Sequence, residues 1–423
     1  MIENININSN IRLHYIPLTK LKTTTMGVYI HRSLNKQDAP YNALLPFVLK
    51  RGCAVCPDTE ATAKYLENLY GAKFGAAVMK RGEDHIMYFD AEVISDRYAP
   101  QNERLLSALT KLLLSVLFAP VTENGAFKAD FTEQEKNNAA DRIEAVRNDK
   151  RTYASDRCSE EMCRDSAFAI SQYGTKEEIA AITAQSLYEY YKRIITASFI
   201  DIYVCGDADI SEIKNKISET VSGMTFEKAD IPRTEILKSC SGVKNVTEEM
   251  NVMQGKLSIG FTTDTKPTDS DYTALTVMNS VFGSGAHSKL FNNVREKLSL
   301  AYYASSQLEK YKGLLIVNSG IEFKNFEKAY NETLAQLENI KNGDISDEEF
   351  ESSINALLNS LESLKDDQRM MQNFYLGEEV IGITADIEDK KAAIKKVTKE
   401  DIQHAAQKLK LNTVYFLTGK EEK

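Results

Sequence analysis

Two stretches of the chain share one pattern: MGVYIHRSLNKQDAPYNALLPFVLKRG at residues 26–52 and LSIGFTTDTKPTDSDYTALTVMNSVFG at residues 257–283. Each begins with alternating apolar residues, passes through a polar segment and continues with apolar residues at helical spacing up to a glycine. Tyr41 and Tyr272 align at an offset of 231 residues, and the closing glycines align at the same offset. The pattern predicts a strand, a turn and a helix in each copy.

The ends of the two halves also match each other. Residues 182–206 have the pattern of a helix followed by a strand that stops at a glycine, and residues 397–419 repeat that order. Thr398 and Asp401 have the spacing of a helix N-cap box. Strands and helices do not alternate regularly along the chain, which favours an α+β fold over a doubly wound parallel sheet.

The repeat decides the expected number of domains. A chain of 423 residues has the length of about three ordinary domains, yet the matching halves favour two copies of one domain. We therefore predict an N-terminal domain at residues 1–225, a C-terminal domain at residues 245–423 and a polar linker near residues 226–244. In each domain we expect a mixed or antiparallel β-sheet packed against helices.

Composition and charge limit the class of partner. Hydrophobic residues make up 43% of the chain and charged residues 27%, which excludes global disorder. Acidic residues outnumber basic ones by 61 to 52, so the chain lacks the basic character of a nucleic-acid-binding protein. The most apolar stretch, residues 105–121, is interrupted by Lys111 and Pro120, and residues 1–20 lack a secretory pattern. We expect a cytoplasmic protein with reduced cysteines and with no nucleic-acid or membrane partner.

The most distinctive stretch of the chain is VFGSGAHSKLFNNVREKLSLAYY at residues 281–303. It closely resembles the signature of the C-terminal half of the M16 (pitrilysin/insulinase-like) zinc peptidases, in their two-domain branch. That signature joins a glycine-containing loop, a helix with a Leu-Phe pair, an Arg-Glu-Lys triplet and a Leu-Ala-Tyr strand start. The resemblance spans the whole chain, including GTKEEI at residues 174–179 and a helix expected after residues 345–349. It implies one half of a clamshell, built from two homologous α+β domains.

The same resemblance implies a zinc site that this chain has lost. The family carries an inverted His-x-x-Glu-His motif on the first helix and a further Glu ligand downstream. The match around Gly52 puts the two His positions at Ala43 and Phe47, the Glu position at Pro46 and the distal Glu position at Arg142. None of these side chains can bind a zinc ion or move a proton, and an arginine would repel a cation. The histidines are His14, His31, His85, His287 and His404, and no two of them are four residues apart.

The C-terminal half retains the features that the family uses for substrate. In some two-domain members, one subunit carries zinc, and the other lacks it but contributes an Arg and a Tyr. The resemblance places these at Arg295 and Tyr302, where they would donate hydrogen bonds to a substrate carbonyl or oxyanion. It implies that this chain holds no cofactor and that a partner M16 homologue with an intact His-x-x-Glu-His motif holds the zinc. The expected substrate is a peptide or unfolded protein, bound as an added strand at a sheet edge.

Two other roles stay open. The chain could be a purely structural M16 homologue, or a self-sufficient metallopeptidase with a displaced site. Within its branch it is similar to members associated with the 5-aminopentanol modification of elongation factor P, which suggests a pathway. Cys53 and Cys56 have redox or zinc-knuckle spacing, but a single such pair is a weak signal. Asp84 and His85 precede an expected strand, and we predict a hydrogen-bonded histidine at the surface there.

Overall fold

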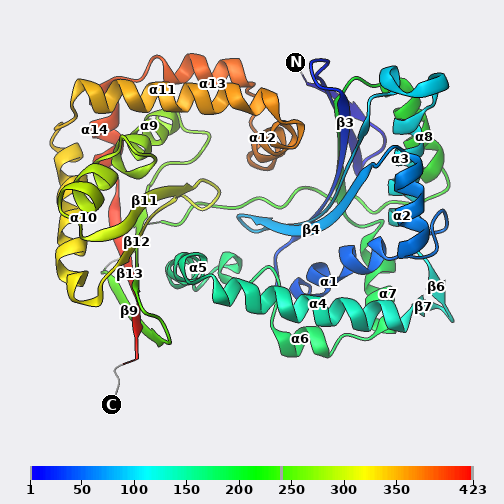
Figure 1. Ribbon diagram of the computed structural model, residues 1–423, viewed down its shortest axis with the longest axis horizontal. Helices are drawn as coiled ribbons and strands as arrows, with labels where there is room; N and C mark the ends of the chain where they lie inside the picture. The colour runs from blue at the N-terminus through cyan, green and yellow to red at the C-terminus, as the bar shows by residue number, and fades with distance from the viewer. Residues whose placement is uncertain (1, 239–241, 421–423) are drawn as a thin grey trace. The chain divides into compact units, whose positions relative to one another are not determined.

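The computed structural model describes residues 2–238 and 242–420 (Figure 1). It is a mixed α+β structure whose two sheets pack against helices, which confirms the fold class expected from the sequence. The repeated stretches form strand β3 (Thr23–Ser33) with helix α1 (Ala39–Lys50), and strand β10 (Gly255–Thr262) with helix α9 (Tyr272–Gly283). The predicted strand, turn and helix are therefore present in both copies.

The sheet of the first half has the strand order β1-β2-β8-β3-β5-β4. The bounds of the other strands are β1 Glu3–Asn6, β2 Ile11–Pro17, β4 Lys73–Arg81, β5 Asp84–Ile94 and β8 Phe199–Gly206. Only β2 and β8 run parallel within this sheet, and its other pairs are antiparallel.

The sheet of the second half has the order β11-β12-β10-β13-β9. Its other strands are β9 Lys244–Met250, β11 Ala301–Glu309, β12 Leu314–Ile321 and β13 Lys410–Gly419. Here the parallel pair is β9 with β13, and the remaining pairs are antiparallel. Read from β9 to β11, the order and directions repeat those from β2 to β4, as expected for two copies of one domain.

The helices of each half pack through apolar side chains on one face of its sheet or on one another. In the first half these are α1, α2 (Thr59–Asn68), α3 (Leu105–Phe118), α4 (Ala129–Asn148), α6 (Lys176–Ala180), α7 (Ala184–Ile194) and α8 (Ile210–Val221). In the second half they are α9, α10 (Phe326–Lys341), α11 (Asp347–Ser363), α13 (Ile387–Ile394) and α14 (Lys399–Gln407). A two-stranded ribbon, β6 (Thr122–Glu123) with β7 (Ala126–Phe127), completes the elements of the first half.

Alternation along the central strands explains the two hydrophobic cores. Met26, Val28 and Ile30 point from β3 to the helices of the first half, and all three are buried. On β10, Leu257 and Ile259 do the same for the second half. The residues between them point to the opposite face, because successive side chains of a strand alternate.

That opposite face of each sheet is covered by a helix from the other repeat. The chain divides into one compact unit of residues 1–144, 170–233 and 364–380 and another of residues 145–169, 234–363 and 381–423. Helix α5 (Lys150–Met162) therefore belongs with the second sheet, and most of α12 (Gln368–Ile381) belongs with the first.

The predicted limits of the two repeats differ from these compact units. The repeats follow internal sequence similarity, whereas the units follow spatial contact, so the limits at residues 225 and 245 stay a prediction. Within the predicted linker, residues 239–241 lie outside the residues that the structure describes.

Specific contacts hold α12 against the first sheet and α5 against the second sheet. On α12, Gln372 Nε2 donates to both the carbonyl and the hydroxyl oxygen of Thr25, at 3.2 and 2.9 Å. On α5, Cys158 and Met162 lie one turn apart, and both face Gly260 of β10. A Cβ atom at Gly260 would collide with the sulfur of Met162 and approach that of Cys158. The glycine is therefore needed for the close approach of helix and strand.

Substitution of Gly260 by alanine tests the packing of α5 on the second sheet. We expect Gly260→Ala to lower the free energy of unfolding by about 1–3 kcal/mol, because the added methyl group forces Met162 out of its place. Urea unfolding followed by circular dichroism measures the change. Gly223→Ala is the matched control, since a Cβ atom there meets no neighbour. An equal effect of the two substitutions would show that Gly260 is not a packing constraint.

Candidate functional site

The positions aligned with the zinc motif lie on helix α1. Ala43 and Pro46 are buried there, and Phe47 is partly buried. Pro46 lies inside the helix and has no N–H group to donate to the preceding turn. The distal position, Arg142, lies on α4. The local sequence therefore retains the helices on which the family would build its zinc site, but with other side chains.

The structure brings two of these positions together. The guanidinium carbon of Arg142 lies 3.7 Å from the centre of the Phe47 ring, which is a cation–π stack. Nη1 of Arg142 is 3.7 Å from Oε2 of Glu135, and Oε1 of Glu135 is 2.6 Å from Nη2 of Arg51. Burial lowers the pKa of Arg142 from its usual value, and Glu135 opposes that change.

This arrangement does not fit a zinc ion. Alanine, proline and phenylalanine side chains have no lone pair to share with a metal, and the guanidinium of Arg142 carries a positive charge. Among residues 2–238 and 242–420, no group of three or more His, Cys, Asp or Glu side chains is placed to hold a metal ion. We therefore derive no chemical step through zinc on this chain.

Arg295 and Tyr302 lie in the second half, on either side of a turn. Arg295 belongs to a π-helical segment, Leu290–Lys297, that is anchored by buried Leu290 and Val294. Its guanidinium carbon lies 4.6 Å from the centre of the Phe291 ring, and its side chain is 41% exposed. The guanidinium is thus held by its neighbour yet remains accessible.

A β-bulge at the start of β11 places Tyr302. The pairing of β11 with β12 shifts between Ala301 and Tyr303, so Tyr302 is the extra residue of the bulge. Bulges commonly re-aim a side chain away from a sheet, and Tyr302 is 63% exposed. Among the described residues, no hydrogen-bond partner faces its hydroxyl group. Arg295 and Tyr302 can therefore both reach a molecule outside the chain.

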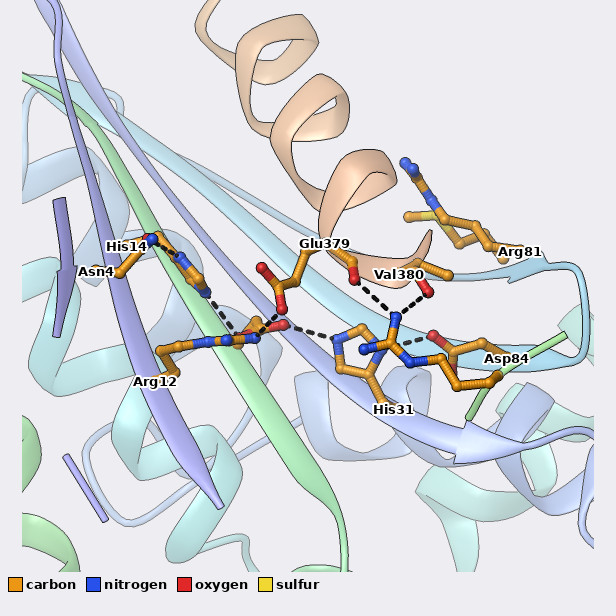
Figure 2. A network of polar contacts seen from close by, with 11 residues as sticks. Asn4, Arg12, His14, His31, Arg81, Asp84, Glu379 and Val380 are labelled. Atoms are coloured by element: carbon orange, nitrogen blue, oxygen red, sulfur yellow. Dashed lines mark hydrogen bonds and ion pairs between the residues drawn. The ribbon is translucent and has the colours of Figure 1, made fainter. Parts of the chain in front are cut away.

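A buried polar network on the first sheet was not foreseen from the sequence. His31 of β3 lies between two carboxylates: its Nδ1 is 2.6 Å from Oδ2 of Asp84, and its Nε2 is 3.2 Å from Oδ2 of Asp201. Figure 2 shows Asp84 on one side of His31, with His14, Arg12 and Glu379 on the other. All of these groups except Arg12 and Glu379 are almost completely buried.

The network continues from Asp201 to helix α12. Oδ1 of Asp201 lies 2.8 Å from Nε2 of His14 and accepts a hydrogen bond of 3.1 Å from Nε of Arg12. Arg12 in turn donates from Nη2 to Glu379 of α12 at 2.7 Å. One sequence signal could have located part of this network. Arg12 and His14 are two residues apart on β2, so their side chains point to the same face of the sheet.

The charges of the network explain its proton affinities. Burial alone would lower the pKa of His31, but Asp84 and Asp201 outweigh burial and raise it to about 10. Burial alone would raise the pKa of Asp201, but His14 and His31 lower it well below its usual range. His31 is therefore an imidazolium whose two N–H groups face two carboxylates.

His85 is a correction to the sequence-based prediction. We predicted a histidine at the surface, but the side chain is fully buried. Its Nδ1 is 3.2 Å from Nδ2 of Asn42, and burial lowers its pKa to about 4. The sequence pattern could not show this, because Asn42 lies on α1 and reaches His85 only through tertiary packing.

The charge on His31 makes stability depend on pH. The pKa of His31 is raised in the folded state. The contribution of its charge to the free energy of unfolding is therefore complete below pH 6.5, the ordinary pKa of histidine, and is lost as the pH rises toward 10. In that window we expect this group to lower the free energy of unfolding by up to about 1.4 kcal/mol per pH unit. Urea unfolding at several pH values, with nitrogen-15 NMR of the imidazole, measures both quantities.

A variant pair isolates the cause of that shift. Asp84→Asn removes one of the two carboxylates and should move the NMR titration midpoint of His31 downward. His404→Gln, at an exposed position of α14, should leave that midpoint unchanged. A wild-type midpoint at or below 6.5 would contradict the charged form of His31.

Comparisons with known proteins give the class of this chain. Residues 181–357 match the family described as the Peptidase M16 inactive domain. The chain is 37% identical over 410 residues to a probable inactive metalloprotease, YmfF, of Bacillus subtilis, and the match covers 96% of each chain. The chain thus belongs to the M16 peptidase family, as a homologue of its inactive metalloproteases.

Solved structures share the fold of this chain. A conserved protein from Enterococcus faecalis has a TM-score of 0.91 and 31% identity, and the match covers 100% of this chain and 99% of that one. The peptidase M16 inactive domain from Pseudomonas fluorescens has a TM-score of 0.78 at 18% identity, with coverage of 99% and 98%. The second likeness concerns the fold alone.

Proposed function

We propose that this chain is the non-catalytic subunit of a heterodimeric M16 zinc peptidase. One contrast supports the proposal above others. Two positions predicted for the zinc motif are occupied by the partly buried Arg142–Phe47 stack, whereas Arg295 and Tyr302 remain exposed in an intact family segment. A chain that had lost every role in proteolysis would have no need to keep that segment accessible.

Arg295 and Tyr302 have hydrogen-bond donors suited to peptide hydrolysis. A guanidinium and a phenol hydroxyl can both donate to a substrate carbonyl, and both favour the oxyanion that develops when water attacks it. The zinc that activates this water would be held by the partner subunit. The role of this chain would be to position the substrate and stabilise the developing charge.

The proposed partner is an M16 homologue with an intact His-x-x-Glu-His motif. The proposed substrate is a peptide or unfolded protein, bound in extended form along a sheet edge. We keep a cytoplasmic location and the elongation factor P pathway as predictions. Among the described residues, no helix has both the length and the apolar character needed to cross a membrane.

A structural role is the alternative. A purely scaffolding M16 homologue would use the same two domains to bind neighbours without contributing to cleavage. It would form a stable complex with the zinc-bearing homologue, and that complex would cleave no peptide. The accessible Arg295 and Tyr302 favour the first role.

Substitutions at the two exposed residues test the proposal in the purified heterodimer. We expect Arg295→Ala to lower kcat for peptide cleavage on the order of 100-fold and Tyr302→Phe to lower it about tenfold, since each removes a donor to the oxyanion. A fluorogenic peptide assay measures both rates. Lys297→Ala and Tyr70→Phe, at other exposed positions, should retain full activity. Wild-type rates in both Arg295→Ala and Tyr302→Phe would refute the assignment.

Metal content tests the idea of a self-sufficient peptidase with a displaced site. We expect the purified chain to carry far less than one zinc ion per molecule, because the motif positions offer no ligand. Plasma emission spectrometry after dialysis measures the content. The opposite outcome is one zinc ion per chain, removed by a chelator together with peptidase activity, and it would favour the self-sufficient enzyme.

A further inference from the structure

A pocket of about 410 Å³ lies at the start of helix α5, within the second compact unit. Its walls come from the end of α4, the first residues of α5, and the turn between β9 and β10 with the start of β10. The residues that matter for its chemistry are Asp149, Lys150, Arg151, Met253, Gln254 and Lys256. Neither the zinc-motif positions nor the Arg295–Tyr302 pair contributes to this lining.

An aromatic ring organises two of its cationic side chains. The guanidinium carbon of Arg151 is 4.3 Å from the centre of the Tyr303 ring, and Nζ of Lys256 is 5.7 Å from the same centre. Both distances fall within the range of cation–π interactions. Two positive groups therefore share one ring on the same face of the sheet.

The sheet register builds this arrangement. Gly320 of β12 pairs with Lys256 on one side and with Tyr303 on the other, so the three residues form one row across three strands. A Cβ atom at Gly320 would lie 2.5 Å from Cε1 of Tyr303 and 3.1 Å from Oε1 of Gln254. The glycine therefore leaves the space in which the tyrosine ring and the pocket wall meet.

The positive charge of the pocket is only partly balanced, because Asp149 is the one carboxylate in its lining. Among the described residues, no carboxylate lies within 4 Å of the side-chain nitrogens of Lys150, Arg151 or Lys256. Lys150 donates to the carbonyl of Arg147 at 2.8 Å, and Arg151 donates to the hydroxyl of Ser305 at 3.2 Å. Lys256 donates to the side-chain oxygen of Gln254. All three partners are neutral groups.

The acidic residue in the pocket wall is already occupied. Oδ1 of Asp149 accepts from the backbone N–H groups of Arg151 and Thr152, both at 3.2 Å, and Oδ2 accepts from the Thr152 hydroxyl at 2.7 Å. These bonds lower the pKa of Asp149, in keeping with its role as the N-cap of α5. Burial and the nearby Arg151 lower the pKa of Lys256, and Asp149 opposes that change. Such crowding of like charges would be relieved by an anion.

We propose that this pocket binds a carboxylate group of an acidic peptide. A guanidinium and an ammonium group at one site match the geometry of a carboxylate through charge-assisted hydrogen bonds. Met253, which is completely exposed at the rim, offers an apolar contact to the neighbouring peptide residue. In a chain of net charge −9, general affinity for anions is not expected, which makes this local site selective.

The pocket would give the proposed peptidase a substrate subsite. This use of the pocket rests on the proposed function. Tyr303, whose ring contacts Arg151 and Lys256 of the pocket, directly follows Tyr302, the proposed substrate-binding tyrosine, on β11. Because the bulge at Tyr302 interrupts the regular alternation of side chains along β11, one peptide could contact both residues at neighbouring positions. The substrate class inferred for the peptidase is therefore peptides that carry an acidic residue or a free C-terminal carboxylate near the cleaved bond.

Fluorescence anisotropy with the full chain tests the pocket without a partner subunit. The probe is a short fluorescein-labelled peptide of alternating Glu and Gly residues, compared with its Gln counterpart, each with a free or an amidated C-terminus. We expect Arg151→Gln and Lys256→Gln each to weaken binding of the Glu peptide about tenfold, because each removes a charged donor. Rising salt should weaken binding as well.

Matched variants separate charge from structure. Lys328→Gln removes the same charge from an exposed position of α10 in the same unit and should leave binding unchanged. Arg151→Lys keeps the charge and should retain most of the affinity. Circular dichroism melting of each variant verifies folding. The side chain of Arg151 is exposed, so Arg151→Gln and Arg151→Lys disturb the packing of the fold least.

The two carboxylate sources give different results. Loss of binding on changing Glu to Gln, with no effect of amidation, identifies a side-chain carboxylate. Loss on amidation alone identifies the peptide C-terminus. Equal binding of the amidated Gln peptide, or wild-type affinity in both Arg151→Gln and Lys256→Gln, would overturn the proposal. Displacement by inorganic phosphate that is stronger than displacement by acetate at equal ionic strength would overturn the choice of carboxylate.

Peptide cleavage by the heterodimer distinguishes failure of the pocket from failure of the proposed function. If Arg295→Ala abolishes cleavage while Arg151→Gln leaves KM for the Glu peptide unchanged, the function stands and the pocket inference fails. If the isolated chain binds the Glu peptide through Arg151 and Lys256 while the complex cleaves nothing, the pocket stands and the peptidase role fails.

Discussion

Each sheet of this protein has two faces to bury, and its own helices cover only one of them. The second face of the first sheet carries charged and polar side chains, and helix α12 supplies their partners through Glu379 and Gln372. A buried charge without a partner is costly, so the first unit depends on a helix that belongs to the second repeat. The same need is met at the second sheet by α5, whose close approach requires Gly260.

Two of the positions predicted for the zinc motif, Phe47 and Arg142, contact each other in the structure. Removal of ligands alone would leave a weakly packed hollow between α1 and α4, which costs stability. Here the aromatic ring of Phe47 and the guanidinium of Arg142 fill that position against each other, and Glu135 lies close to the charge. The N-terminal half thus keeps the fold of its family, with an arginine stacked on a phenylalanine at two of the positions predicted for the zinc motif.

The second compact unit presents the opposite situation, because several of its polar and charged groups lie at the surface. Tyr302 is turned out by a bulge, Arg295 is held on Phe291, and Arg151 and Lys256 crowd one pocket. Another molecule could supply these groups with further hydrogen bonds or with an opposite charge. This accessibility is the observation on which the proposed peptide ligand of the second unit rests.

The sequence by itself determined the α+β class, the duplicated strand–helix units and the absence of zinc ligands at Ala43 and Phe47. These features follow from local periodicity and from the identity of single residues. Only the tertiary structure decided that α5 packs on the second sheet and α12 on the first. It also decided the charge of His31, the burial of His85 and the stack of Arg142 on Phe47. Each of these joins residues far apart in the chain, and a local pattern carries no information about which distant side chains will meet.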